Sequence, residues 1–110
     1  MAIAIGNVTT SATTVYTSSG NSVVTFFSIT NYSGSDQTAN VWVVPNGSSA
    51  SNLNLAITTL TIAANGTSSG DTYQFYAGNE KLILANGDTL QVQCGGNNNA
   101  LSTIVSYTSA

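Results

Sequence analysis

Residues 81–96 read KLILANGDTLQVQCGG, which is an apolar run, an Asn-Gly pair and an alternating run. This order is typical of two β-strands joined by a tight turn. Successive side chains of a strand point to opposite faces, so a change of one residue in the turn moves every side chain of the second strand to the other face. The length of this turn therefore decides which residues form the core.

Three arrangements fit this stretch. A two-residue turn pairs Leu84 with Thr89 and puts the leucines of the two strands on opposite faces. A three-residue loop, with Gly87 in the left-handed conformation, pairs Leu82 with Leu90 and gathers the apolar side chains on one face, so we favour it. If the two strands belong to opposite sheets, the turn becomes a connection across a sandwich and neither pairing forms.

Charged residues are scarce in this chain. They make up 5% of its 110 residues, against about 25% in an ordinary soluble domain. Lys81 is the single basic residue and there is no histidine, so the sequence lacks the basic clusters that bind phosphates or membrane surfaces and the commonest metal ligand. We expect no nucleic acid, membrane, metal or cofactor to bind. Lys81 is expected on the wet face of its strand, together with Ile83, and Asp88 is expected to cap amides of the turn.

The remaining candidates for chemistry have structural explanations. The four acidic residues, Asp36, Asp71, Glu80 and Asp88, fall in turns or at strand ends, where solvated carboxylates are common. Cys94 is the only cysteine, which excludes an internal disulfide, and it occupies the strand position of a small buried apolar residue. We therefore expect a protein that is not an enzyme and has no catalytic residues.

The whole chain has the pattern of an all-β protein. Its apolar segments are short, rich in β-branched and aromatic residues, and separated by Gly, Asn, Ser and Asp. About eight short strands without a substantial helix predict a single antiparallel β-sandwich, jelly-roll-like, over residues 1–110. Residues 1–12 are expected to form an N-terminal arm or strand that contacts neighbours. The strand candidates are Ala2–Ile5, Thr13–Thr17, Ser22–Asn31, Ala39–Val44, Leu53–Ile62, Thr72–Tyr76, Lys81–Leu84, Thr89–Cys94 and Leu101–Thr108.

The strand at 22–31, SVVTFFSITN, is apolar on both faces. Simple alternation puts Val23 and Phe27 on one face and Val24 and Phe26 on the other. A strand that is buried on one side only does not need Phe26. We infer that this strand is central and that another part of the fold, or another subunit, covers its second face.

Two further aromatic residues are candidates for contacts. Trp42 is expected in the core, with a contact at an interface as the alternative. In TYQFY at 72–76, Phe75 is expected in the core, and Tyr76 is the best candidate for an outward anchor.

Three segments resemble small β-sandwich proteins of tailed-bacteriophage particles. VVTFFSITNYSGSDQTANVWVVPNG at 23–47 is similar to their strand–N-x-S-G–strand hairpin, KLILANGDTLQVQ at 81–93 to their L-x-x-G-D-x-L strand–turn–strand, and LSTIVSYTSA at 101–110 to their closing strand. Such proteins are head decoration or cement proteins, neck and tail accessories, or fibre domains. The resemblance implies a virion protein, made in the host cytoplasm, whose partners are the major capsid protein or other virion proteins. It implies no catalysis.

The composition favours the same role. Low charge reduces the free energy needed to remove a surface from water, which suits a protein that packs against other proteins. Together with the role that the resemblance implies, this leads us to expect a capsid decoration or cement protein that stabilises the head shell through protein contacts. A homo-oligomer is expected, with a trimer favoured, and the terminal strands are expected at the contacts. The alternatives are a tail, neck or fibre accessory and, in another class, a carbohydrate-binding β-sandwich module. The candidate interface residues are Ile3, Ile5, Trp42, Tyr76, Ile104 and Tyr107.

Overall fold

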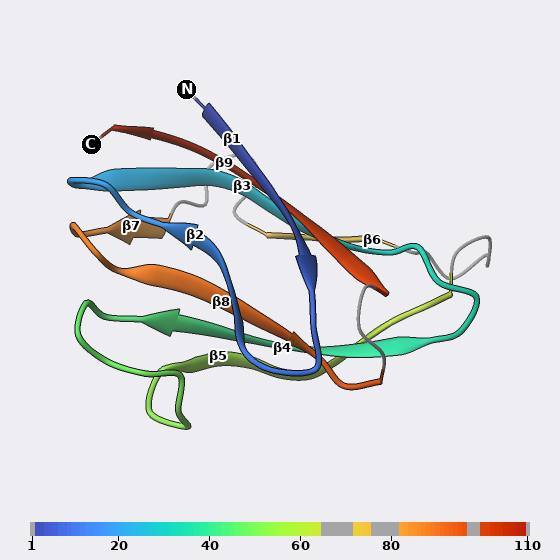
Figure 1. The fold of residues 1–110 in the computed structure, drawn as a ribbon. Coiled ribbons are helices and arrows are strands. Elements are labelled where there is room, and N and C mark those ends of the chain that lie inside the picture. Colours follow the sequence, from blue (N-terminus) through green and yellow to red (C-terminus); the bar gives the residue numbers. More distant parts are fainter. Residues whose placement is uncertain (1, 65–71, 76–81, 97–99, 110) are drawn as a thin grey trace.

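The structure, a computed structural model, describes residues 2–64, 72–75, 82–96 and 100–109. These residues form nine β-strands and no helix, arranged as two antiparallel sheets (Figure 1). The all-β sandwich predicted from the sequence is thus confirmed. The strands are β1 (Ala2–Val8), β2 (Thr13–Thr17), β3 (Ser22–Asn31), β4 (Gln37–Val44), β5 (Leu55–Ile62), β6 (Thr72–Phe75), β7 (Leu82–Leu84), β8 (Thr89–Cys94) and β9 (Leu101–Ser109).

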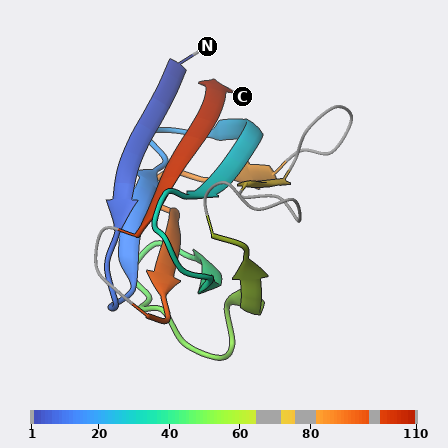
Figure 2. The same cartoon turned by 90° about the vertical axis from the view of Figure 1, so that its right-hand side faces the viewer.

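The order of the strands is that of a jelly roll. Sheet A has the order β1-β9-β3-β6, with β7 also paired to β3, and sheet B has the order β2-β8-β4-β5. The first strand therefore pairs with the last, the second with the eighth and the fourth with the fifth, as in one long hairpin rolled over itself. Figure 2 shows the two layers, with the N- and C-termini side by side at one end.

Strands β6 and β7 share one place in sheet A. β6 pairs antiparallel with the second half of β3, from Phe27 to Thr30, and β7 pairs antiparallel with its first half, from Ser22 to Val24. Both are therefore pieces of the same position beside β3. Counted by position, the nine strands fill the eight places of a jelly roll.

The favoured hairpin pairing at 81–96 is wrong, because β7 belongs to sheet A and β8 to sheet B. The turn between them is a connection across the sandwich, which is the third of the arrangements considered. Gly87 has the expected left-handed conformation, with φ at 85°, and the Asp88 amide donates to the Ala85 carbonyl at 3.1 Å. Leu84 and Leu90 still point into the same core, since each faces it from its own sheet.

A β-bulge in β3 corrects the expected faces of that strand. The register against β9 shifts between Val24 and Phe26. As a result Val24 and Phe27, which simple alternation puts on opposite faces, are both buried in the core. Val23 and Phe26 lie on the outer face and are partly exposed.

The core lies between the sheets and is almost entirely apolar. Cys94 is 1% exposed there, as expected for a small buried residue, and its thiol donates to the Gln37 side-chain oxygen at 3.3 Å. The core cluster consists of Val8, Val15, Tyr16, Val24, Phe27, Ile29, Ala39, Val41, Ile62, Leu84, Leu90, Val92, Cys94, Ala100, Leu101 and Val105.

Loops at one end of the sandwich are joined by two polar side chains. The Asp88 carboxylate accepts hydrogen bonds from the Ala85 and Asn46 amides, both at 2.9 Å. The Asn86 side-chain oxygen accepts from the Gly20 amide at 2.8 Å. Asp88 therefore caps loop amides, as the sequence predicted, and together with Asn86 it links three loops that are distant in the chain.

Asn31 holds the loop at the opposite end. Its side chain is fully buried, and its amide nitrogen donates to the carbonyls of Ser35 and Ile62, each at 2.9 Å. Its oxygen accepts from the Ser33 amide at 2.9 Å. The Asn-Tyr-Ser-Gly stretch is therefore a turn organised by one asparagine, which also ties this turn to the end of β5.

Candidate functional site

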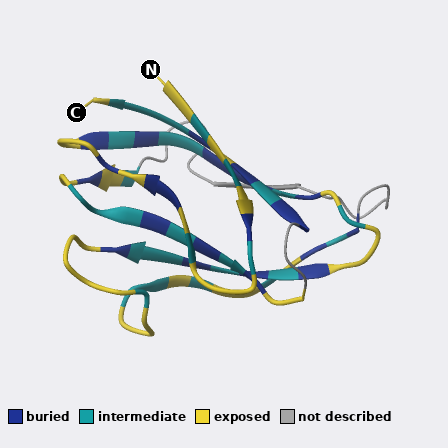
Figure 3. Ribbon diagram, viewed as in Figure 1, coloured by how far each residue is buried: buried dark blue, intermediate teal, exposed yellow. Residues whose placement is uncertain are grey.

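The outer face of sheet A carries four exposed isoleucines, which we call the isoleucine face. Ile3 and Ile5 on β1 are 67% and 78% exposed, Ile83 on β7 is 71% exposed, and Ile104 on β9 is 42% exposed. Figure 3 shows how much of β1 is open to solvent. Scattered single apolar residues are common on surfaces, but four on one sheet face are typical of a contact surface.

The pairing of β1 with β9 brings three of the predicted contact residues together. Ile5 lies directly opposite Ile104, and Ile3 lies opposite Ser106. Side chains directly opposite each other in an antiparallel pair are close enough to touch. A hollow of about 320 Å³ follows this part of the sheet and is lined by Ile5, Gly6, Asn7, Ser102, Thr103 and Ile104.

Strand β3 extends the apolar surface toward β7. Val23 pairs with Ile83, and Phe26, set on the outer side by the bulge, pairs with Ser106. The Thr25 hydroxyl donates to the Ser106 carbonyl at 3.1 Å, which fixes the bulge beside the neighbouring strand. Hydroxyl groups lie between the apolar side chains, and none of the described residues on this face is charged.

The other predicted contact residues lie elsewhere. Trp42 pairs with Gln91 and Leu55 on sheet B, is partly exposed and does not belong to the core cluster, so its expected place in the core is wrong. Tyr107 is on β9 but points inward, against the core. Tyr76 lies outside the described residues.

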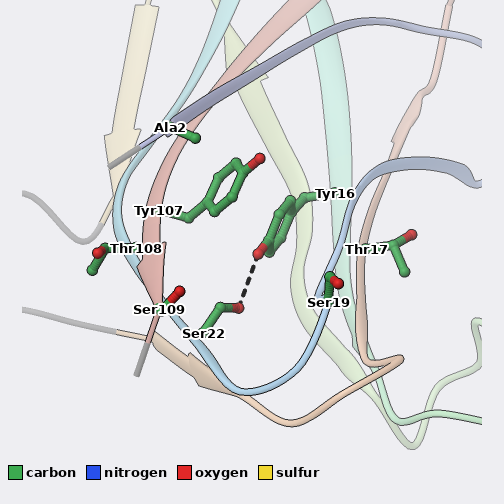
Figure 4. A pocket seen from close by; sticks show the side chains of 8 residues that line it. All are labelled: Ala2, Tyr16, Thr17, Ser19, Ser22, Tyr107, Thr108 and Ser109. Atoms are coloured by element: carbon green, nitrogen blue, oxygen red, sulfur yellow. Dashed lines mark hydrogen bonds between the residues drawn. The ribbon is translucent and has the colours of Figure 1, made fainter.

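Tyr107 belongs to a second feature, a hollow at the end of the sandwich where the termini meet (Figure 4). Its ring stacks on that of Tyr16 with centroids 4.4 Å apart and planes 36° apart. We call this feature the tyrosine hollow; it measures about 210 Å³. It is lined by Ala2, Tyr16, Thr17, Ser19, Ser22, Tyr107, Thr108 and Ser109.

A chain of hydroxyl groups anchors one side of the tyrosine hollow. The Tyr16 hydroxyl donates to the Ser22 hydroxyl at 2.9 Å, which lies 2.7 Å from the Ser18 hydroxyl. Ser18 in turn donates to the Gly20 carbonyl at 2.7 Å. These buried hydroxyls satisfy one another, so the Tyr16 ring is held in one orientation.

The two carboxylates that the structure describes, Asp36 and Asp88, have structural partners. The Asp36 carboxylate accepts from the Ala64 amide at 2.9 Å, and Asp88 binds the loop amides described above. Among the described residues no three metal-ligating side chains come together. Asp71, Glu80 and Lys81, which is the single basic residue of the sequence, lie outside the described residues.

Sequence reasoning missed two residues of these surfaces. The sequence places Ile83 on the wet face beside polar residues, and an isoleucine at such a position is itself a signal of a contact surface. Tyr16 stands next to Val15 in a five-residue strand whose register shifts against β8 between Thr14 and Tyr16. Both Val15 and Tyr16 are buried, so alternation alone could not have assigned Tyr16 a face.

No family model, curated protein or solved structure matches this chain. The part of the chain that the structure describes contains no helix long and apolar enough to cross a membrane.

Proposed function

We propose that this protein is a structural component of a tailed-phage particle, of the head decoration or cement type, which binds other virion proteins through the isoleucine face. The observation that carries the proposal is the set of four exposed isoleucines on one sheet face, where none of the described residues is charged. Exposed apolar patches of this kind mark protein contacts. The similarity of three sequence segments to small phage β-sandwich proteins supports the same assignment. Jelly rolls occur in capsid proteins and in other functions alike, so the fold alone decides nothing.

The burial of the isoleucine face supplies a moderate driving force. The exposed fractions of the four side chains add up to the surface of about 2.6 fully exposed isoleucines. Full burial of one such side chain contributes about 1.5–3 kcal/mol, so the face supplies about 4–8 kcal/mol. Association costs an estimated 4–15 kcal/mol in lost freedom. One copy would therefore bind a partner weakly, whereas linked copies would bind far more tightly, because the second contact is intramolecular.

This balance favours a homo-oligomer, and we propose a closed trimer as the unit that attaches to the particle. Decoration sites on a shell are symmetric, so a symmetric oligomer can engage several equivalent sites at once. The low charge of the chain adds to this. Among the described residues the isoleucine face carries no ion that would have to leave water on binding.

The test is to find the protein in purified particles of the phage whose genome encodes it, and to count its copies. Quantitative mass spectrometry with an isotope-labelled standard of this chain gives the copy number per particle. We expect hundreds of copies, as for a coat of decoration proteins on a symmetric shell; about a dozen or fewer would overturn the head assignment in favour of a neck, tail or fibre accessory. Absence from the particles would overturn the proposal as a whole.

A further inference from the structure

We infer that the tyrosine hollow is a binding site for a single neutral sugar ring. The hollow is separate from the isoleucine face, since it opens between the sheets at the end where the termini meet, whereas the isoleucine face is the outer surface of sheet A (Figures 1 and 4). The inference is therefore independent of attachment to a particle.

The size of the hollow sets an upper limit on the ligand. Pockets for drug-sized molecules measure about 300–1,000 Å³. At about 210 Å³ the tyrosine hollow is smaller and suits one small ring rather than an extended molecule. A ligand larger than this would have to extend out of the hollow into solvent.

The lining determines the chemistry of the ligand. Two tyrosines supply aromatic surface, and the exposed Ser19 and Ser109 supply hydroxyls, with Thr17 and Thr108 beside them. None of the described residues that line the hollow is charged, so they offer an ionic ligand no partner in exchange for its hydration. A ring with apolar C–H faces and several hydroxyls, which is the description of a neutral sugar, matches such a mixture of aromatic surface and hydroxyl groups.

The two tyrosines differ in exposure and in hydrogen bonding. Tyr16 is nearly buried, and its hydroxyl is already engaged by Ser22, so its ring forms a fixed wall. Tyr107 is partly exposed, and its hydroxyl makes no hydrogen bond to any described residue. A phenolic hydroxyl can donate one hydrogen bond and accept others, so Tyr107 is the lining residue best placed to bind a ligand hydroxyl.

The experiment is titration of the ¹⁵N-labelled protein with glucose, galactose, mannose and N-acetylglucosamine, followed by two-dimensional NMR. The acyclic polyol sorbitol serves as the comparison ligand, because it has the hydroxyls without the ring. We expect amide shifts at residues 16–22 and 107–109 with at least one sugar at tens of millimolar, and smaller shifts or none with sorbitol. No shifts at these residues with any of the four sugars would overturn the inference.

Three variants test whether the hollow is responsible. Tyr107→Phe removes only the hydroxyl and is expected to weaken sugar binding several-fold. Ser19→Asp, at an exposed position on the rim, adds bulk and charge and is expected to weaken it about tenfold or more. Tyr32→Phe is the matched control, because Tyr32 is also exposed but its hydroxyl bonds to Asn7 away from the hollow. Binding that is unchanged in both Tyr107→Phe and Ser19→Asp, or that is lost equally in Tyr32→Phe, would contradict the assignment.

Discussion

Replacement of Gly87 by alanine tests how the loops at the jelly roll's turn-rich end are held together. The φ angle of Gly87 is 85°, a left-handed conformation that costs other residues roughly 1–2 kcal/mol. A Cβ atom at this position would also lie 2.5 Å from Cγ of Asn46, which is too close for an ordinary contact. The Gly87→Ala variant should therefore lose free energy of unfolding for two separate reasons.

A neighbouring glycine separates the two reasons. Gly47 also has a φ angle of 85°, but a Cβ atom added there would meet nothing within 4 Å. Gly47→Ala should therefore show only the conformational loss, about 1–2 kcal/mol. Gly87→Ala should lose about 1 kcal/mol more through overpacking against Asn46. In the double variant Gly87→Ala with Asn46→Ala, this additional loss should disappear, so that the two substitutions are not additive.

Urea unfolding provides the measurement. Trp42 is the only tryptophan and is partly exposed on sheet B, so its fluorescence should report the loss of the native structure. Each variant is compared with the parent protein only if the two have the same m value, because a shifted midpoint then reports a change in the free energy of unfolding. Equal losses in Gly87→Ala and Gly47→Ala, or an additional loss that persists without the Asn46 side chain, would refute the contact between these loops.

Three further predictions concern the free energy of unfolding, measured by the same urea titration, and the accessibility of Cys94. Asn31→Ala should lower the free energy of unfolding by about 2–3 kcal/mol, because it leaves the buried Ile62 carbonyl without its donor; a loss below about 0.5 kcal/mol would contradict this. Thr59→Gly should raise the free energy of unfolding by about 1 kcal/mol, because Thr59 is a β-branched residue with a left-handed φ of 54°. A decrease would show that the contacts of the Thr59 side chain contribute more than the backbone strain costs. The Cys94 thiol should react with an aromatic disulfide reagent only when the protein opens, so the rate should rise with urea; fast labelling of the native protein would contradict its burial.

Much of the fold could be predicted from local patterns. The bounds of β2, β3 and β8 match the strands expected from the sequence, because clusters of Gly, Asn, Ser and Asp end each apolar run. The left-handed Gly87 and the capping role of Asp88 could also be predicted, since turn chemistry depends on residues within a few positions of one another.

The errors arise where distant parts of the chain decide the outcome. The choice of sheet for β7 depends on its pairing with β3, about sixty residues earlier, which the 81–96 stretch does not encode. No glycine or proline marks the bulge after Val24 in the sequence. The bulge puts the residues before it on the opposite face from the one that simple alternation predicts from the residues after it. Trp42 is apolar enough for a core, but the place of β4 in sheet B sends it outward.

Three of the four residues of the isoleucine face could be predicted from the sequence. Ile3, Ile5 and Ile104 stood out because they are apolar residues near the ends of a polar chain, and pairing of the first strand with the last brings them together. Ile83 joins them only through the pairing of β7 with β3, and the tyrosine hollow depends on side chains from both sheets. Ile83 could be suspected as a contact residue from the sequence, but its place beside the other isoleucines and the tyrosine hollow both require the three-dimensional arrangement.

The central claim is that the isoleucine face binds other virion proteins, and the most direct test is the affinity of one surface variant for particles. Ile5→Asp removes a side chain that is 78% exposed and puts a charge on the face, whereas the matched control Leu53→Asp makes the same kind of change at a 99% exposed loop residue away from it. Affinity for particles that lack the native protein should fall at least about tenfold in Ile5→Asp, since 1.4 kcal/mol corresponds to a factor of ten, and should stay unchanged in Leu53→Asp. Equal affinities of Ile5→Asp and the parent protein would contradict the claim.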